Sequence, residues 1–276
     1  MTAASHSILA ELSRHTPVIV QGLSNVKAIA ANGSHSMALT EDGSVYVWGD
    51  NPWGQLGDGS TTDRTLPVKN PHLSGIVRIA AGTYHSMAVK ADGTFYVWGD
   101  NTYGQLCDGS LTSTLTPKVV ALGQAATSIS GGWYHTAVAL ADGTMRGCGA
   151  NDAGQLGNGT LAHSPTPVNP NLSGVKAVFA GGEHTLVQLA DGTARAFGDN
   201  ASGTLGNGTK TSSAVPVTVS QPSGIVAMSA GFNHSLALRS DGTLHAFGLN
   251  SYGRLGDGTT TSRSTAVQVL GGVRLP

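Results

Sequence analysis

The sequence predicts an all-β chain folded as a single-domain β-propeller of five four-stranded blades, and three observations support this fold class. The first is a histidine, followed by Ser or Thr, that recurs every 49 or 50 residues, at His35, His85, His135, His184 and His234. The second is a D-G pair whose glycine lies eight residues after each histidine; in the first copy this glycine is Gly43. The third is a glycine-rich loop that follows in each copy, such as Asp50–Gly59. Short strands repeated at this period are typical of propeller blades, because one blade cannot bury both of its faces alone.

Four short antiparallel strands are expected within the first repeat. Val26–Ala31 and His35–Thr40 form the first two. Ser44–Trp48 forms the third, after a D-G turn in which glycine supplies the positive φ that a hairpin needs. Leu66–Val68 begins the fourth, and the proline within it is tolerated only at the start or edge of a strand. The other repeats share the pattern, so we expect the same strands in each.

The propeller is expected to span 16–276, after an N-terminal extension, 1–15, that contains a short helix. The five repeats cover about 26–75, 76–125, 126–174, 175–224 and 225–276. Thr16–Val20 resembles the fourth strand of a repeat although it precedes the first one. We therefore predict that 16–25 closes the ring by pairing with the last blade. In the alternative, the two terminal strands begin a sixth, incomplete blade.

Two aligned positions are large and apolar in almost every repeat, which places them in the core between blades. One position holds Trp48, Trp98, Cys148, Phe197 and Phe247, and the other holds Ile29, Ile79, Ile129, Val178 and Met228. Cys148 is therefore interpreted as a core residue rather than a nucleophile. Cys107 is the only other cysteine, and two cysteines do not make a disulfide framework. We expect no disulfide, and reduced thiols suit a cytoplasmic protein.

The charge balance argues against two classes of partner. A net charge of -1 and a pI near 6.8 do not suit general nucleic-acid binding or a membrane surface, both of which need an excess of Lys and Arg. No run of 18 apolar residues is present, so no membrane span is expected. The N-terminus lacks the basic start and apolar core of a secretory signal. A cytoplasmic location is therefore expected, unless a signal sequence precedes Met1.

The repeat resembles that of the regulator of chromosome condensation family. The match is carried most clearly by His35–Leu39, the Asp42-Gly43 pair and Gly54–Gly59, and it extends from about Val26 to Val269. The resemblance implies a β-propeller, for which seven blades are the commonest family arrangement. Similar proteins include nucleotide-exchange factors for a small GTPase, a plant ultraviolet-B photoreceptor, a secreted β-lactamase inhibitor and many uncharacterised bacterial proteins. The resemblance is specific for the fold, and it implies no single function.

The repeated polar residues offer other chemistries, each with a structural alternative. Five histidines could suggest metal binding or acid–base work. Equivalent positions lie far apart around a ring, however, whereas the ligands of one zinc ion lie about 2 Å from it. Loops such as Asp50–Gly59 carry oxygen ligands that could suit calcium, but Asp and Asn before glycine are ordinary turn formers. No G-x-S-x-G or H-E-x-x-H motif is present. We therefore expect no metal site, no cofactor and no catalytic residue.

Candidate binding residues are expected where the repeats differ, because the shared positions build the ring. The two residues before each histidine should emerge on one face, in the turn between the first and second strands. The candidates in this series are Tyr84, Trp133, Tyr134, Glu183, Phe232 and Asn233. A second series supplies Trp53, Tyr103 and Tyr252, in blades that are contiguous if the ring closes. Exposed Trp and Tyr often anchor interfaces, although the same aromatics could merely pack on neighbouring turns or loops.

The favoured hypothesis is a non-catalytic, monomeric scaffold that binds a protein or peptide through the aromatic turn face around Trp133. One alternative is an enzyme or small-ligand-binding protein that uses the central channel or a pocket on one face. Another is an inhibitor of a secreted enzyme. Substitution of Trp133 and Tyr134 separates the first hypothesis from the others, because partner binding should be lost while the fold is kept.

Overall fold

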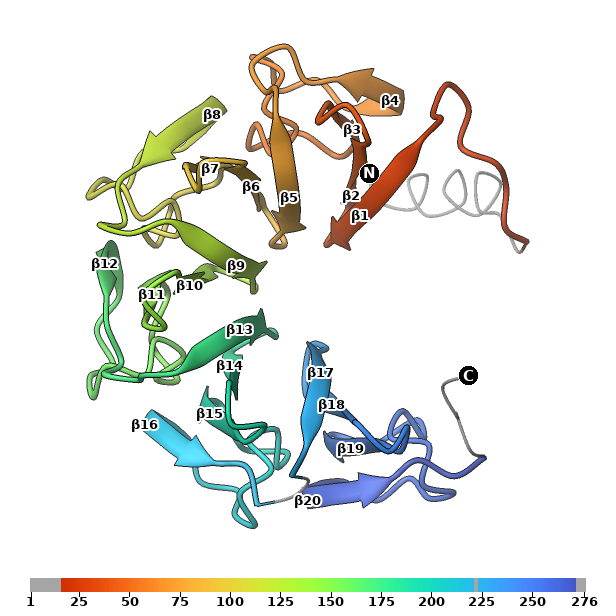
Figure 1. Ribbon diagram of the computed structural model, residues 1–276, viewed down its shortest axis with the longest axis vertical. Coiled ribbons are helices and arrows are strands. Elements are labelled where there is room, and N and C mark those ends of the chain that lie inside the picture. The colour runs from red at the N-terminus through yellow and green to blue at the C-terminus, as the bar shows by residue number, and fades with distance from the viewer. Residues whose placement is uncertain (1–15, 221–222, 272–276) are drawn as a thin grey trace, which may run out of the picture.

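The computed structural model describes residues 16–220 and 223–271, and this part of the chain contains strands and turns without a helix. Its strands, β1 to β20, form five antiparallel sheets of four. The sheets are arranged around a central axis as the blades of a β-propeller (Figure 1). Five four-stranded blades confirm the predicted fold class. The expected N-terminal extension with its helix lies outside the described residues. Within the described ranges, no helix is long and apolar enough to cross a membrane.

Each blade is formed by four consecutive strands that pair in chain order. Blade 1 contains β1 (Val26–Asn32), β2 (His35–Thr40), β3 (Val45–Gly49) and β4 (Arg64–Lys69). Blade 2 contains β5 (Ile76–Ala81), β6 (His85–Lys90), β7 (Phe95–Gly99) and β8 (Thr114–Val120). Blade 3 contains β9 (Ala126–Gly131), β10 (His135–Leu140), β11 (Met145–Gly149) and β12 (Ser164–Val168). Blade 4 contains β13 (Val175–Ala180), β14 (His184–Leu189), β15 (Ala194–Gly198) and β16 (Ser213–Thr218). Blade 5 contains β17 (Ile225–Ala230), β18 (His234–Arg239), β19 (Leu244–Gly248) and β20 (Arg263–Gln268).

Turn residues explain why each repeat folds locally into a blade. Gly43, between β2 and β3, has a φ of 78°, and its N–H donates to the carbonyl of Thr40. In the long loop after β3, the side chain of Asn51 accepts a hydrogen bond from the N–H of Leu56 and donates to the carbonyl of Thr62. The other four blades repeat this arrangement through Asn101, Asn151, Asn200 and Asn250. A hydrogen-bonded amide thus organises the loop that had been considered for calcium.

The hydrophobic core lies between adjacent blades. Between blades 1 and 2, Val45 and Leu56 pack with Ile76 and Trp98. Equivalent clusters fill the next three interfaces. The predicted aromatic core position is confirmed for blades 2 to 5, since Trp98, Cys148, Phe197 and Phe247 are fully buried, whereas Trp48 in blade 1 is only half-buried. Burial of this apolar area holds the blades together.

A hydrogen-bond chain that contains the repeated histidine crosses each of these interfaces. Nε2 of His35 in blade 1 lies 2.7 Å from Oγ of Ser86 in blade 2, and this hydroxyl donates to the carbonyl of Gln55 in blade 1. The other three interfaces contain the same chain, through His85 and Thr136, His135 and Thr185, and His184 and Ser235. Because the hydroxyl proton goes to the carbonyl, Nε2 of each histidine must be the donor. These four histidines therefore connect adjacent blades.

The predicted closure of the ring is wrong. Thr16–Val20 forms no strand, and no strand from 16–25 is added to the last blade. The reason is curvature, because the five blades form an arc and Figure 1 shows a wide opening between β1 and blade 5. One face of blade 1 has no neighbouring blade, so Ile29 is 80% exposed. Val20 lies beside this open face, where it lines an apolar groove with Ile29 and Trp48. The described residues contain no sixth sheet.

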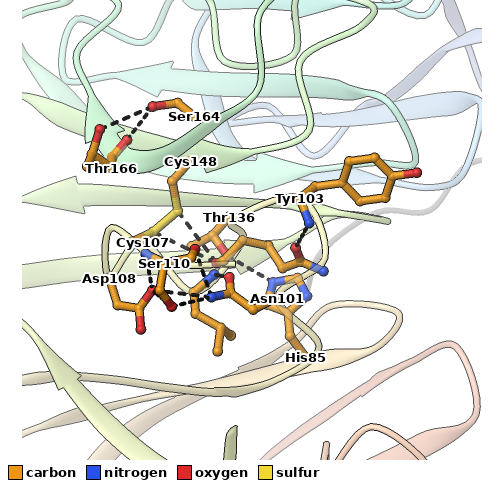
Figure 2. Close-up of a disulfide and its surroundings, with 12 residues drawn as sticks. His85, Asn101, Tyr103, Cys107, Asp108, Ser110, Thr136, Cys148, Ser164 and Thr166 are labelled. Atoms are coloured by element: carbon orange, nitrogen blue, oxygen red, sulfur yellow. Dashed lines mark hydrogen bonds between the residues drawn. A yellow bond between two sulfur atoms is a disulfide. The ribbon is translucent and has the colours of Figure 1, made fainter. Parts of the chain in front are cut away.

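The expectation of reduced cysteines is also wrong, because Cys107 and Cys148 form a disulfide (Figure 2). Cys148 is fully buried, as its assignment to the core requires. Cys107 lies in the loop after β7 and Cys148 lies in β11, so the bond links blade 2 to blade 3. At the other three interfaces, a glycine occupies the position of Cys107 and packs against an aromatic ring at the position of Cys148. These pairs are Gly57 with Trp98, Gly157 with Phe197 and Gly206 with Phe247. The two cysteines are 41 residues apart and meet only when the blades stack.

Candidate functional site: an aromatic turn face

The turns between the first and second strands of the blades surround the axis of the propeller. The ends of β1, β5, β9, β13 and β17 point toward this axis in Figure 1. Residues from all five blades line a hollow of about 370 Å³, which we call the axial hollow. Its wall includes Thr83, Trp133, Gly182 and Phe232. The residue two positions before the repeated histidine therefore lines the axial hollow in every blade.

Backbone hydrogen bonds fix these turns relative to one another. The N–H of Trp133 donates to the carbonyl of Gly182, and the N–H of Gly182 donates to the carbonyl of Phe232. The turn of blade 2 is joined to blade 3 in the same way, from Thr83 to Gly132. The turns of blades 2 to 5 thus form a continuous rim, and their side chains project from ordered backbone.

Five aromatic side chains on this rim and its adjoining loop form a continuous group, which we call the aromatic row. The ring of Phe232 meets Trp133 edge-on, with centroids 4.3 Å apart, and Trp133 lies 6.1 Å from Tyr134. Tyr134 stacks with Tyr84 at 5.6 Å and contacts Tyr103 at 4.9 Å. Such pairs stabilise one another by about 0.5–1.5 kcal/mol beyond the area that they bury. The row joins residues from blades 2, 3 and 5.

The members of the aromatic row are only partly covered by one another. Tyr84, Tyr103, Trp133 and Tyr134 are half-buried, whereas Phe232 is 46% exposed. Packing on neighbouring turns, the alternative considered for these residues, therefore accounts for part of their surface. The rest of each side chain is accessible to solvent, and Trp133 and Phe232 also line the axial hollow.

Three other predicted site residues lie apart from the aromatic row. Trp53 and Tyr252 are exposed, and no aromatic contact within the described residues joins either of them to the row. Tyr252 lies under the guanidinium of Arg254, 5.6 Å from it. Asn233 has no aromatic ring to join the row, and its backbone carbonyl accepts a hydrogen bond from the N–H of Leu249, as the equivalent carbonyl does in every other blade. The expected continuity of Trp53, Tyr103 and Tyr252 is wrong, because blades 1 and 5 are separated by the opening in the arc (Figure 1).

Carboxylates lie beside the aromatic row. Glu183 is exposed in the turn of blade 4, and its pKa is raised by partial burial and by the nearby Asp199 and Asp152. The pKa of Tyr134 is raised mainly by burial, with smaller contributions from Tyr84 and Asp100. The carboxylates of Glu183, Asp152 and Asp199 thus lie near one another, and that of Asp100 lies near Tyr134.

Sequence reasoning missed the aspartates of this site and the contact between the two variable series. Asp100 and Asp199 occupy the same repeat position, directly after the third strand, and Asp152 lies two residues further along its loop. The repeated aspartate was a usable signal, but it had been considered only for calcium binding and turn formation. The contact between Tyr103 and Tyr134 had no such signal, because the two residues belong to different blades.

Comparison with protein families identifies the class of the protein. The model of the RCC1-like domain matches residues 5–223, and the model of the regulator of chromosome condensation (RCC1) repeat matches residues 225–254. The chain therefore belongs to the RCC1-like domain family. The resemblance inferred from the repeat is confirmed.

Individual relatives match either a short part of this chain or its fold. E3 ubiquitin-protein ligase HERC2 from Homo sapiens is 62% identical over 47 residues, which are 16% of this chain and 1% of that protein. Ultraviolet-B receptor UVR8 from Arabidopsis thaliana is 46% identical over 44 residues, 16% of this chain and 10% of the receptor. Each alignment thus covers about one repeat. The chain spans a tenth or less of these relatives' lengths.

Solved structures show the same fold over most of the chain. Human WBSCR16 aligns with a TM-score of 0.79 and 24% identity, over 89% of this chain and 67% of that one. Prp20p from Saccharomyces cerevisiae aligns with a TM-score of 0.80 and 22% identity, over 89% of this chain and 63% of that one. The structure of Prp20p was described together with its binding to Gsp1p and histones. The chain spans about two thirds of both solved propellers.

Proposed function

We propose that this chain is a non-catalytic protein-binding propeller whose partner docks on the aromatic row at the rim of the axial hollow. The observation that carries the proposal is the convergence of five aromatic side chains from three blades on one partly exposed surface. Large aromatic residues contribute much of the binding energy in protein interfaces, and they lose little conformational entropy when they bind.

The rigidity of the rim supports this role. Because hydrogen bonds between successive turns hold the backbone in place, the aromatic row is ordered before a partner arrives. The polar groups beside it are engaged in loop structure rather than paired for proton transfer. Asp100, for example, accepts hydrogen bonds from the side chains of Thr102 and Gln105. The binding of Gsp1p and histones by Prp20p shows that a propeller of this fold can serve as a protein-binding surface.

Selection from a displayed library of random peptides tests the proposal. Peptides enriched on the wild-type chain should lose binding by at least about tenfold when Trp133 is replaced by alanine. Trp53→Ala is the matched control, since Trp53 is an exposed tryptophan outside the aromatic row. Melting temperatures of both variants check the fold. Enriched peptides that bind the Trp133→Ala variant as tightly as the wild type would exclude the aromatic row as the binding surface.

The disulfide bears on where the protein acts. Disulfides persist in oxidising compartments and are rare in the cytosol of most cells. We therefore propose an extracytoplasmic location in place of the cytoplasmic one expected from the sequence, and this keeps an inhibitor of a secreted enzyme as a second candidate function. Alkylation of free thiols in freshly lysed cells, followed by mass spectrometry, tests the location. Complete alkylation of Cys107 and Cys148 would contradict it.

A further inference from the structure

We infer that the segment bound by the aromatic row is cationic, and that it presents a Lys or Arg side chain to the tyrosines of the row and to the carboxylates beside them. This inference rests on the proposed function and adds the chemistry of the partner. Its basis is the distribution of charge over the two ends of the blades, combined with the geometry of the aromatic rings.

The turn end of the blades has an excess of negative charge. In each blade the loop after the third strand lies beside the turn, because its first N–H donates to a turn carbonyl, as from Asp100 to Tyr84 and from Asp199 to Glu183. The carboxylates in these turns and the first five or six loop residues are Asp50, Asp100, Asp152, Glu183 and Asp199, against Arg254 as the only Lys or Arg. The whole chain has 15 Lys and Arg and 16 Asp and Glu, so its remaining surface carries an excess of cations.

At the opposite end of the blades, and in the outer part of the long loops, hydrogen bonds and nearby Lys or Arg side chains of the same chain compensate the charge of the carboxylates. The aspartate of each D-G turn has a lowered pKa, first through hydrogen bonds to a nearby hydroxyl and then through a Lys or Arg of the same blade, as for Asp142 near Arg146 and Asp191 near Arg195. In the outer part of the long loops, Asp58 pairs with Arg64 at 2.7 Å. Asp108 with Lys118 and Asp257 with Arg263 repeat this pairing.

Glu183 has the opposite surroundings. Its charged neighbours are the carboxylates of Asp199 and Asp152, which raise its pKa together with partial burial. Asp152 itself is exposed, and it accepts a hydrogen bond from Nε2 of His163, 3.2 Å away, while Nδ1 of His163 accepts one from the N–H of Asn151. Negative charge at this place is therefore not balanced by Lys or Arg in the described chain, and a cation from a partner would relieve the repulsion.

The aromatic rings beside these carboxylates suit the same ligand. Tyr103 and Tyr134 are in contact, and Tyr103 also meets the ring of His163, which pairs with Asp152. Aromatic faces attract ammonium and guanidinium groups through the ring quadrupole, and neighbouring carboxylates strengthen that attraction. The row continues through Trp133 to Phe232 in blade 5, which provides apolar surface for the rest of an extended segment. A peptide with Lys or Arg beside apolar residues matches this surface.

Peptide selection under defined salt tests the inference. Random peptides selected on the wild-type chain should be enriched in Lys and Arg relative to the input library. The double variant Glu183→Gln with Asp152→Asn should bind the selected peptides about tenfold more weakly at low ionic strength, and the difference should shrink at high salt because exposed charges are screened. Both side chains are exposed, so the fold should be kept. Asp92→Asn with Asp142→Asn, two exposed carboxylates at the opposite end, is the matched control.

The outcomes separate this inference from the proposed function. Neutral or acidic selected peptides that still require Trp133, or cationic peptides that bind the Glu183 and Asp152 variant unchanged, would overturn the cationic partner and leave the binding face in place. Peptides that do not require Trp133 would overturn the binding face itself. Binding of free arginine or lysine as tightly as the selected peptides would replace the peptide with a small cation and also overturn the inference.

Discussion

Nε2 of His35 lies 2.7 Å from Oγ of Ser86, and this hydrogen bond joins the first blade to the second. The same bond is present at all four interfaces between described blades. Burial favours the neutral form of these four histidines, because it lowers the pKa of each imidazole. The repeated histidine thus holds adjacent blades together, and the proposed binding surface lies at positions that the repeats do not share.

The buried histidines predict that stability falls in mild acid. Burial lowers the pKa of His35 and His135 to about 4 and that of His85 and His184 to about 3, from an ordinary value of 6.5. Below pH 6.5 the unfolded chain binds protons that the folded chain cannot bind, so stability is fully present above pH 6.5 and is lost toward pH 4. The slope is at most about 1.4 kcal/mol per pH unit for each histidine.

Urea denaturation between pH 7 and pH 5 measures this effect. The interval avoids the titration of the D-G aspartates, whose pKa values are lowered from 3.8. A free energy of unfolding that is constant over this range would contradict buried, neutral histidines.

Individual histidines are predicted to differ according to their place in the arc. His135→Ala removes a fully buried side chain and leaves the hydroxyl of Thr185 without its donor, so it should destabilise the chain by about 2–4 kcal/mol. His234 is only half-buried, and the described residues contain no following blade for it to contact. His234→Ala should therefore cost less than about half as much. Chemical denaturation measures the free energy of unfolding of both variants. An equal loss of stability in the two would contradict the claim that His135 stabilises the chain by connecting blades.

We predict that the disulfide between blades 2 and 3 stabilises its interface in the way that a contact between glycine and an aromatic ring stabilises the other interfaces. Reduction should destabilise the chain by about 2–4 kcal/mol, since the bond closes a loop of 41 residues. The double variant Cys107→Gly with Cys148→Trp should recover most of this loss under reducing conditions. Glycine also suits position 107, where φ is +59° and a side chain is disfavoured.

The single variant Cys148→Trp provides the control for the disulfide. A Cβ atom at the equivalent Gly57 would lie 2.5 Å from Nε1 of Trp98, so the side chain of Cys107 should clash with a new indole. The single variant should therefore be less stable than the double variant. Equal melting temperatures in reducing buffer would contradict the proposed equivalence of the two contacts.

The parts of the fold that the sequence could predict are those determined within one repeat. Gly43 and Asn51 organise a turn and a loop through neighbours within a dozen residues, so their pattern was sufficient to place the strands of blade 1. Closure depends on the small rotation between successive blades, which no local pattern encodes. The prediction that Thr16–Val20 pairs with the last blade failed for this reason.

The candidate site was predictable in outline but not in its contacts. Variation before each histidine correctly located Trp133 and Phe232 on one face, because equivalent turns of a propeller share an end. Their edge-on packing, and the meeting of Tyr103 with Tyr134, depend on how blades are placed around the axis. Cys107 and Cys148 pose the same problem, because they belong to different blades and their sulfur atoms meet only when the blades stack.

The most direct test of the aromatic row uses the fluorescence of Trp133. Replacing Trp48 with Phe and Trp53 with Tyr, residues found at the same positions in other repeats, leaves Trp133 and the fully buried Trp98. Acrylamide quenching of this variant therefore reports mainly on Trp133. The proposed site predicts that a saturating selected peptide reduces the quenching constant severalfold. Unchanged quenching at saturation would contradict the central claim that partners bind on the aromatic row.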